Sequence, residues 1–176
     1  MDEIERLIAR FRSEDTARLA DPDKSIKPNI IQALEDHAAD PRALDFLLHV
    51  AADRQEFDLA RIEALKVLEL HEARNDEERS RIAVVLTEVL VDDPDDDVRQ
   101  YAAMAAAYYM SDDRLAAAIV RTAFDMGEDI NLRWNAFAAI KQLGPTPHGI
   151  EVLRRASETP EFRTSALLLL REWNVE

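Results

Sequence analysis

The chain has 176 residues, of which 47% are hydrophobic and 33% are charged, and its formal net charge at pH 7 is −14. This length and balance suit one compact domain or a short solenoid, and the excess of carboxylates disfavours binding to nucleic acid and favours a basic partner. The absence of cysteine excludes disulfides and thiolate metal sites, and the three glycines leave little room for phosphate-binding loops or strand turns.

The chain begins with MDEIERLIAR, an acidic amphipathic segment that predicts a helix over residues 4–20. This segment lacks the basic start and the apolar block of a secretory signal. Further along, the longest apolar runs, IAVVL and ALLLL, are far shorter than the ~20 residues of a membrane span. We therefore expect a cytoplasmic protein that has no membrane partner.

Five amphipathic helices are predicted along the chain, each followed by a second segment of helical character. They cover Ile4–Ala20, Pro41–Asp53, Asp76–Val91, Asp112–Met126 and Pro147–Ser157. Asp, Ser or Thr stands at the breaks between segments, with Pro nearby, which is typical of helix starts. The chain is therefore predicted to be all-α.

The five second segments share one pattern around a basic residue, which we call the anchor. The anchors are Lys27, Arg61, Arg99, Arg133 and Arg163. The residue before each anchor, and those three, four and seven residues after it, are apolar in every segment, and these offsets share one helical face. One hairpin cannot bury such a face alone, so the pattern predicts a single domain of stacked hairpins. The expected repeats cover approximately residues 1–39, 40–73, 74–110, 111–144 and 145–176.

This pattern resembles HEAT-like repeats, and in particular the bacterial subgroup named after phycobilisome lyases. The resemblance lies in the second helix of each hairpin, and DPDDDVRQYAAMAA and EDINLRWNAFAAI match it best. It covers nearly the whole chain and implies a right-handed α-solenoid of about five HEAT-like hairpins. The resemblance says little about activity, because one fold hosts many functions.

The resemblance also implies a series of ion pairs between repeats. In the family, an Asp six residues before the anchor often joins this series. Asp21 and Asp93 hold that position before Lys27 and Arg99, whereas Gln55, Gly127 and Ser157 occupy it elsewhere. We therefore expect Asp93 to serve the series at Arg99, the series to be incomplete, and the curvature to be irregular.

No residue pattern predicts a catalytic, cofactor or metal site. The run DDPDDD begins like a calcium loop, but Val98 and Met104 stand where glycine and an acidic ligand are required, so the run is interpreted as a helix start. HEARN begins like a zinc motif, but Asn75 stands where the second histidine is needed. Nucleophile elbows and Gly-rich loops are also missing. The chain is therefore predicted not to be an enzyme.

The surface that remains for function is the exposed face of the second helices, which line the concave side in this fold. Aromatic, Met and amide side chains concentrate there in the second half of the chain, a composition typical of protein-binding surfaces. The alternative is that some of these residues are ordinary core. The candidate partner-binding residues are Tyr101, Met104, Tyr108, Trp134, Asn135 and Leu168.

Together these features predict a non-catalytic module that binds another protein, expected to be basic, without nucleic acid or cofactor. The most specific hypothesis is a bacterial immunity or inhibitor protein that neutralises a basic toxin. The alternatives are a scaffold or regulatory adaptor, or a lyase-like enzyme. The chain is expected to be a monomer, or a homodimer through ALLLLREW in the last repeat.

Overall fold

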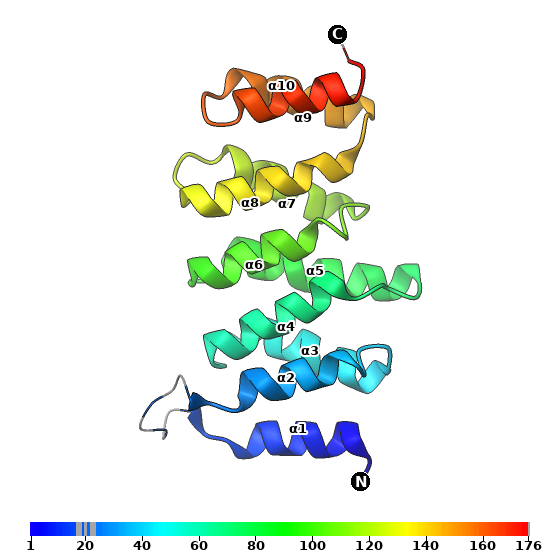
Figure 1. Ribbon diagram of the computed structural model, residues 1–176, viewed down its shortest axis with the longest axis vertical. Helices are drawn as coiled ribbons and strands as arrows, with labels where there is room; N and C mark the ends of the chain where they lie inside the picture. Colours follow the sequence, from blue (N-terminus) through cyan, green and yellow to red (C-terminus); the bar gives the residue numbers. More distant parts are fainter. Residues whose placement is uncertain (17–18, 20, 22–23, 176) are drawn as a thin grey trace.

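The computed structural model describes residues 1–16, 19, 21 and 24–175 (Figure 1). These residues form ten α-helices and no strand, which confirms the all-α prediction. A short 3-10 helix, η3 (Lys141–Leu143), follows α8. The helices are α1 (Glu3–Ser13), α2 (Lys27–Glu35), α3 (Pro41–Ala52), α4 (Asp58–Leu70), α5 (Asp76–Asp92), α6 (Asp96–Ala106), α7 (Asp113–Phe124), α8 (Ile130–Ile140), α9 (Pro147–Glu158) and α10 (Arg163–Glu172).

Side-chain caps start most of these helices. The carboxylate of Asp95 accepts hydrogen bonds from the backbone N–H groups of Asp97 and Val98, and Asp112 and Asp129 start α7 and α8 in the same way. Each cap satisfies N–H groups that have no partner inside the helix, and its charge complements the helix dipole. The acidic run at residues 92–97 is therefore a helix start, as interpreted from the sequence.

The first helix is shorter than predicted. It ends at Ser13, because the backbone of Glu14 is extended, and part of the predicted remainder up to Ala20 lies outside the described residues. The Glu14 carboxylate accepts hydrogen bonds from the Ser25 hydroxyl, at 2.5 Å, and from the backbone N–H of Ile26. It thereby caps the start of α2, whose own N-cap residue offers no polar side chain.

The helices form two layers, one of even-numbered and one of odd-numbered helices, stacked as five hairpins (Figure 1). Helices α2, α4, α6 and α8 pack in series, and α3, α5 and α7 pack in a second series behind them. Helices α2, α4, α6 and α8 approach one another more closely than α3, α5 and α7 do, so the even-numbered helices form the inner layer of the solenoid. The prediction of an α-solenoid of about five hairpins is thus confirmed.

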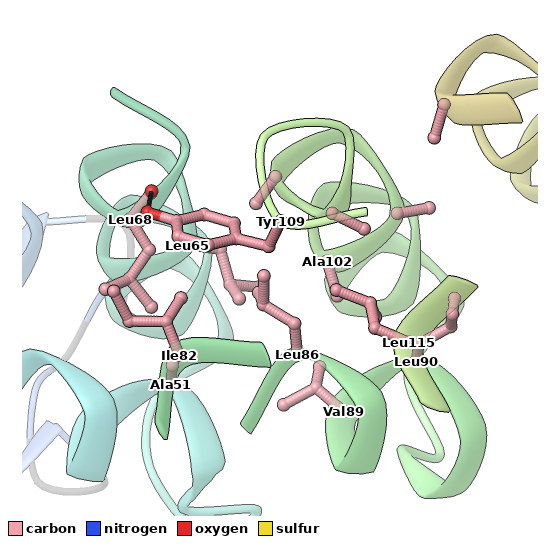
Figure 2. Close-up of a cluster of buried hydrophobic side chains, with 14 of the residues drawn as sticks. Ala51, Leu65, Leu68, Ile82, Leu86, Val89, Leu90, Ala102, Tyr109 and Leu115 are labelled. Atoms are coloured by element: carbon pink, nitrogen blue, oxygen red, sulfur yellow. Dashed lines mark hydrogen bonds between the residues drawn. The ribbon is translucent and has the colours of Figure 1, made fainter. Parts of the chain in front are cut away.

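The core lies between the two layers and follows the repeat pattern. Every apolar position of the pattern is buried except Ile26, which is half-buried, and Leu167, which is 43% exposed. Figure 2 shows the central part of the core, where Leu65, Ile82 and Leu86 meet. Leu167 differs because no described hairpin follows α10 to cover it.

Within this core, Tyr109 of the third hairpin contacts the second hairpin (Figure 2). Its ring is 1% exposed, and its hydroxyl donates to the backbone carbonyl of Leu68 or of His71, at 2.7 and 2.8 Å. Burial raises the pKa of the Tyr109 phenol to about 12. The hydroxyl therefore satisfies carbonyl groups at the end of α4 that the helix leaves without partners.

Each anchor except the last pairs with a carboxylate from the following hairpin. The four inter-hairpin ion pairs are Lys27–Glu56 at 2.7 Å, Arg61–Asp93, Arg99–Glu128 at 2.5 Å and Arg133–Glu161 at 3.3 Å. The three arginines also donate to a backbone carbonyl at the end of the odd-numbered helix in their own hairpin. Each guanidinium therefore joins two hairpins and complements the negative end of a helix dipole.

Two expectations about these ion pairs were wrong. Asp93 pairs with Arg61 of the preceding hairpin and not with Arg99. The series is also not interrupted, because Glu56 and Glu128, one residue beyond the expected positions, supply the carboxylates, and Glu161 does so in the last hairpin. The turn into each even-numbered helix runs beside the preceding anchor, so the carboxylate can come from more than one position in that turn.

Candidate partner-binding surface

The six candidate residues lie on the second helices of the last three hairpins. Tyr101 and Met104 are on α6, and Tyr108 follows its last turn. Trp134 and Asn135 are on α8, which packs directly against α6, whereas Leu168 is on α10. The structure therefore brings the residues of α6 and α8 onto neighbouring helices of the inner layer. It leaves Leu168 apart, because α10 stands farther from α8 than α8 does from α6 (Figure 1).

These side chains are exposed to different degrees. Tyr108 and Leu168 are each 59% exposed, and Met104 and Trp134 are each 38% exposed. Tyr101 and Asn135 are half-buried. Large apolar side chains that share an exposed face are unusual on a surface with no partner.

Tyr101 is held between the core and a lysine of the preceding hairpin. The Nζ atom of Lys66 on α4 lies 5.8 Å from the centre of the Tyr101 ring. Lys66 also donates to the carboxylate of Glu63 at 2.7 Å, and this hydrogen bond raises the pKa of Lys66. Lys66 therefore stays charged, and its attraction to the ring face stabilises the ring orientation.

Trp134 is held by an aromatic cluster at the junction of the last two hairpins. Its ring packs edge-on against Phe162 at 4.9 Å and against Phe137 at 5.7 Å, and these two phenylalanines stack at 4.5 Å. One side of the indole is thus fixed by the core, and the rest faces solvent. A rigid, partly exposed aromatic ring loses little conformational entropy on binding, which is typical of interface hot spots.

The two segments that carry these rings contain no acidic side chain, although Glu63 on α4 lies beside Lys66 next to Tyr101. Residues 100–108 and 130–143 contain no Asp or Glu, although the whole chain has 36. Exposed carboxylates stand instead at or next to the turns that lead into α6, α8 and α10, at the left edge in Figure 1, and further exposed carboxylates occur at the opposite edge, such as Asp113. The carboxylates at these turns include Asp92, Asp96, Asp97, Asp125 and Glu158. We call the exposed side chains of residues 100–108 and 131–140 the neutral strip and the carboxylates at these turns the acidic edge.

Comparison with known families identifies this architecture. The sequence model of HEAT repeats matches residues 83–171, which are 89 of the 176 residues and include the whole neutral strip. The chain is a HEAT-repeat protein. HEAT repeats generally mediate protein–protein interactions and serve as non-catalytic scaffolds. No curated protein and no solved structure matches the chain.

Two exposed apolar side chains of this HEAT-repeat protein were not among the partner-binding residues predicted from the sequence. Ile130 is 44% exposed and lies one helical turn before Trp134, so it extends the neutral strip toward the acidic edge. Met126 is 69% exposed in the turn before α8. The spacing of four between Ile130 and Trp134 was the signal that could have found the first of them.

His71, the histidine of the HEARN segment, forms a structural contact with Glu78 of α5. The Nε2 atom of His71 lies 2.6 Å from the carboxylate of Glu78, which also accepts hydrogen bonds from Arg74. Burial of Glu78 opposes its ionisation, but the hydrogen bonds from Arg74 and His71 prevail and lower its pKa to about 2. Within the described residues, no group of three or more His, Asp or Glu side chains is arranged to hold a metal ion.

Among the described helices, none has both the length and the apolar character that a membrane crossing requires.

Proposed function

We propose that this HEAT-repeat protein is a non-catalytic module that binds a basic partner protein on its neutral strip. The observation that carries the proposal is the pair of fixed, partly exposed rings, Tyr101 and Trp134, on adjacent helices, in segments that contain no carboxylate. Such a surface loses little solvation when it is covered, so its burial favours association.

The acidic edge supports the proposal that the partner is basic. Its exposed carboxylates stand beside the neutral strip and not within it, so they attract a cationic partner without being buried themselves. Charges at the rim of an interface mainly accelerate association and make it sensitive to salt. The most specific form of the proposal is an immunity or inhibitor protein that covers a basic toxin, for which the net charge of −14 is the support.

The test begins with capture of partners from the native lysate, followed by calorimetry with the purified partner. The double variant Tyr101→Ala/Trp134→Ala is expected to weaken binding by at least about 100-fold, because aromatic hot spots commonly contribute ~2 kcal/mol each. Val84→Ala on α5 is the matched control, because Val84 is 43% exposed but lies on the opposite layer. Unchanged affinity of the double variant would exclude the neutral strip as the binding site.

The salt dependence and the stoichiometry of binding separate the specific proposal from a general scaffold. An inhibitor of a basic toxin forms one tight complex whose association slows as the salt concentration rises. Weak binding to several unrelated partners would support an adaptor instead. A coloured cofactor that copurifies with the protein would support the lyase-like subgroup and contradict a purely non-catalytic role.

A further inference from the structure

A groove of about 450 Å³ separates α7 from α9 on the outer layer of the solenoid, whereas the neutral strip lies on the inner layer. Helices α5 and α7 pack directly against each other, but α9 stands farther from α7. The rings of Phe137 and Phe162, stacked at 4.5 Å, keep the last two hairpins apart on the inner side. The outer side of the same junction stays open as the groove.

Three apolar side chains of α7 form one wall of this groove. They are Ala117, Val120 and Phe124. Ala117 is exposed, and the other two are half-buried, so the wall faces solvent. Phe124 is held in place by an edge-on contact with Phe162 at 6.3 Å. An apolar side chain that covers this wall leaves water and gains packing contacts, which favours binding.

Two arginines and one histidine border the apolar wall. Arg121 lies on α7, and His148 and Arg155 lie on α9. The Cζ atom of Arg155 lies 4.0 Å from the centre of the Phe124 ring, and attraction to the ring face holds the guanidinium beside the wall. All three cationic side chains are exposed. Among the residues that the structure describes, no carboxylate lies within ion-pair distance of any of them.

The corresponding groove between α3 and α5 shows what is missing here. Arg81 of α5 lines that groove and pairs with Asp45 of α3 at 2.5 Å, so the chain supplies both charges. Between α7 and α9, the only carboxylate among the described lining residues is Asp125, which accepts a hydrogen bond from the backbone N–H of Gly127 at 2.9 Å. Charge complementarity therefore selects an acidic occupant from outside the described chain.

We propose that this groove binds an acidic segment of a partner protein, at a site separate from the neutral strip. Carboxylates of the segment pair with Arg121 and Arg155, and an aromatic or large aliphatic side chain between them covers Ala117, Val120 and Phe124. Arginine and carboxylate form two parallel hydrogen bonds, and Arg155 is already held in place, so little side-chain entropy is lost. A free inorganic anion would leave the apolar wall uncovered, so an amphipathic segment is the better occupant.

The acidity of the whole chain does not prevent this contact. The net charge is −14, but at physiological salt exposed charges more than ~8 Å apart are largely screened. Binding then depends on the charges that line the groove, which are two arginines and a histidine against one carboxylate.

The test uses a synthetic peptide, Glu-Asp-Trp-Asp-Glu, and heteronuclear NMR of the isotope-labelled full chain. We expect saturable shifts of amide signals in α7 and α9, while those of α2 and α4 stay in place. A peptide with Ser in place of Trp should bind about tenfold more weakly, because it loses the apolar contact. A peptide with Lys in place of each acidic residue should not bind.

A charge reversal identifies the cations that bind the peptide. Arg121→Glu/Arg155→Glu, the groove variant, should weaken peptide binding by at least about 100-fold, because two attractive pairs become repulsive. The matched control is Arg6→Glu/Arg10→Glu on α1, whose arginines are exposed and whose net charge changes by the same amount. This control should bind the peptide within about twofold of the wild-type chain, because its charges are remote and screened.

Four results overturn the proposal. They are a wild-type chain that does not bind the acidic peptide, binding that the groove variant leaves intact, equal weakening by the α1 control, and displacement of the peptide by an equal concentration of inorganic phosphate. The last result would show a site for free anions. Tyr101→Ala/Trp134→Ala should still bind the acidic peptide, so failure of this proposal and failure of the neutral strip as a binding site are distinguishable.

Discussion

Helices α4, α6 and α8 meet through alanines, whereas α8 and α10 meet through aromatic rings. In the centre, Ala64, Ala102 and Ala136 are fully buried and allow the even-numbered helices to approach closely. At the last junction, Phe137 and Phe162 stack between the helices and hold α10 farther from α8 (Figure 1). Small side chains shorten the distance between helices and large ones lengthen it, so one repeat pattern gives two kinds of junction.

The ion pair in the centre is also more buried and better hydrogen-bonded than the ion pair at the last junction. Arg61 and Asp93 are almost completely buried, and Arg61 has partners for its Nε and both Nη atoms. Arg133 is 3% exposed, but its Nη2 atom has no hydrogen-bond partner among the described residues, and the carboxylate of Glu161 is partly exposed. The last hairpin is thus attached by packing of rings more than by polar contacts. We expect it to open before the centre does.

The largest effect should follow the loss of the central ion pair. Asp93→Ala leaves the buried Arg61 guanidinium without its counter-charge, and breaking a buried pair in this way costs about 3–5 kcal/mol. Urea denaturation of the purified chain measures this loss. The control is Asp92→Ala, because Asp92 is exposed and its ion pair with Arg54 is long, at 3.9 Å. Equal stability of the two variants would show that the buried pair does not hold the centre together.

Removing the central ring of the last junction should cost somewhat less. Phe162→Ala deletes a fully buried ring that contacts Trp134 and Phe137, and we expect a loss of about 3 kcal/mol, at the low end for Phe, because a terminal hairpin can partly collapse onto the gap. Hydrogen exchange locates the effect. Amides of α9 and α10 should lose protection while those of α4 and α6 keep theirs. Uniform loss across the chain would contradict a separately opening last hairpin.

Acid should weaken the centre through Glu78. Its pKa is about 2 in the folded chain and lies near 4.5 in an unfolded one, so its contribution to stability is present above pH 4.5 and is lost as the pH falls toward 2. The contribution is at most roughly 3 kcal/mol. Unfolding free energies between pH 7 and pH 3 should fall less steeply in Glu78→Gln than in the wild-type chain. Parallel pH profiles would show that the contacts with Arg74 and His71 are not coupled to folding.

Much of the fold could be predicted from the sequence because the repeat pattern is local. Offsets of three, four and seven residues from an anchor define a helical face, and that face is buried wherever a hairpin follows. The acid partners of the anchors were assigned wrongly because they come from turns about thirty residues away along the chain. Only the folded turns bring Glu56 and Glu128 beside Lys27 and Arg99.

The sequence predicts where the candidate residues lie on the helices, but it does not predict the contacts that fix their side chains. Helical spacing alone places Tyr101 and Trp134 on one side of the inner layer. Their fixed orientations depend on Lys66 and Phe162, which belong to neighbouring hairpins and share no local pattern with the rings they contact. Contacts between distant parts of the chain leave no periodic pattern in the sequence, so they could not be predicted from it.

The smallest effect should come from the ion pair at the last junction. Glu161→Ala removes a carboxylate that is partly exposed, and water can take its place at Nη1 of Arg133, so the loss of stability should be much smaller than for Asp93→Ala. Urea denaturation of the two variants side by side measures the difference, and Glu158→Ala, at the end of α9 just before this turn, is the control. If Glu161→Ala proves as costly as Asp93→Ala, then the last junction depends on its ion pair as much as the centre does. In that case the aromatic cluster adds to that ion pair and does not compensate for a weak one.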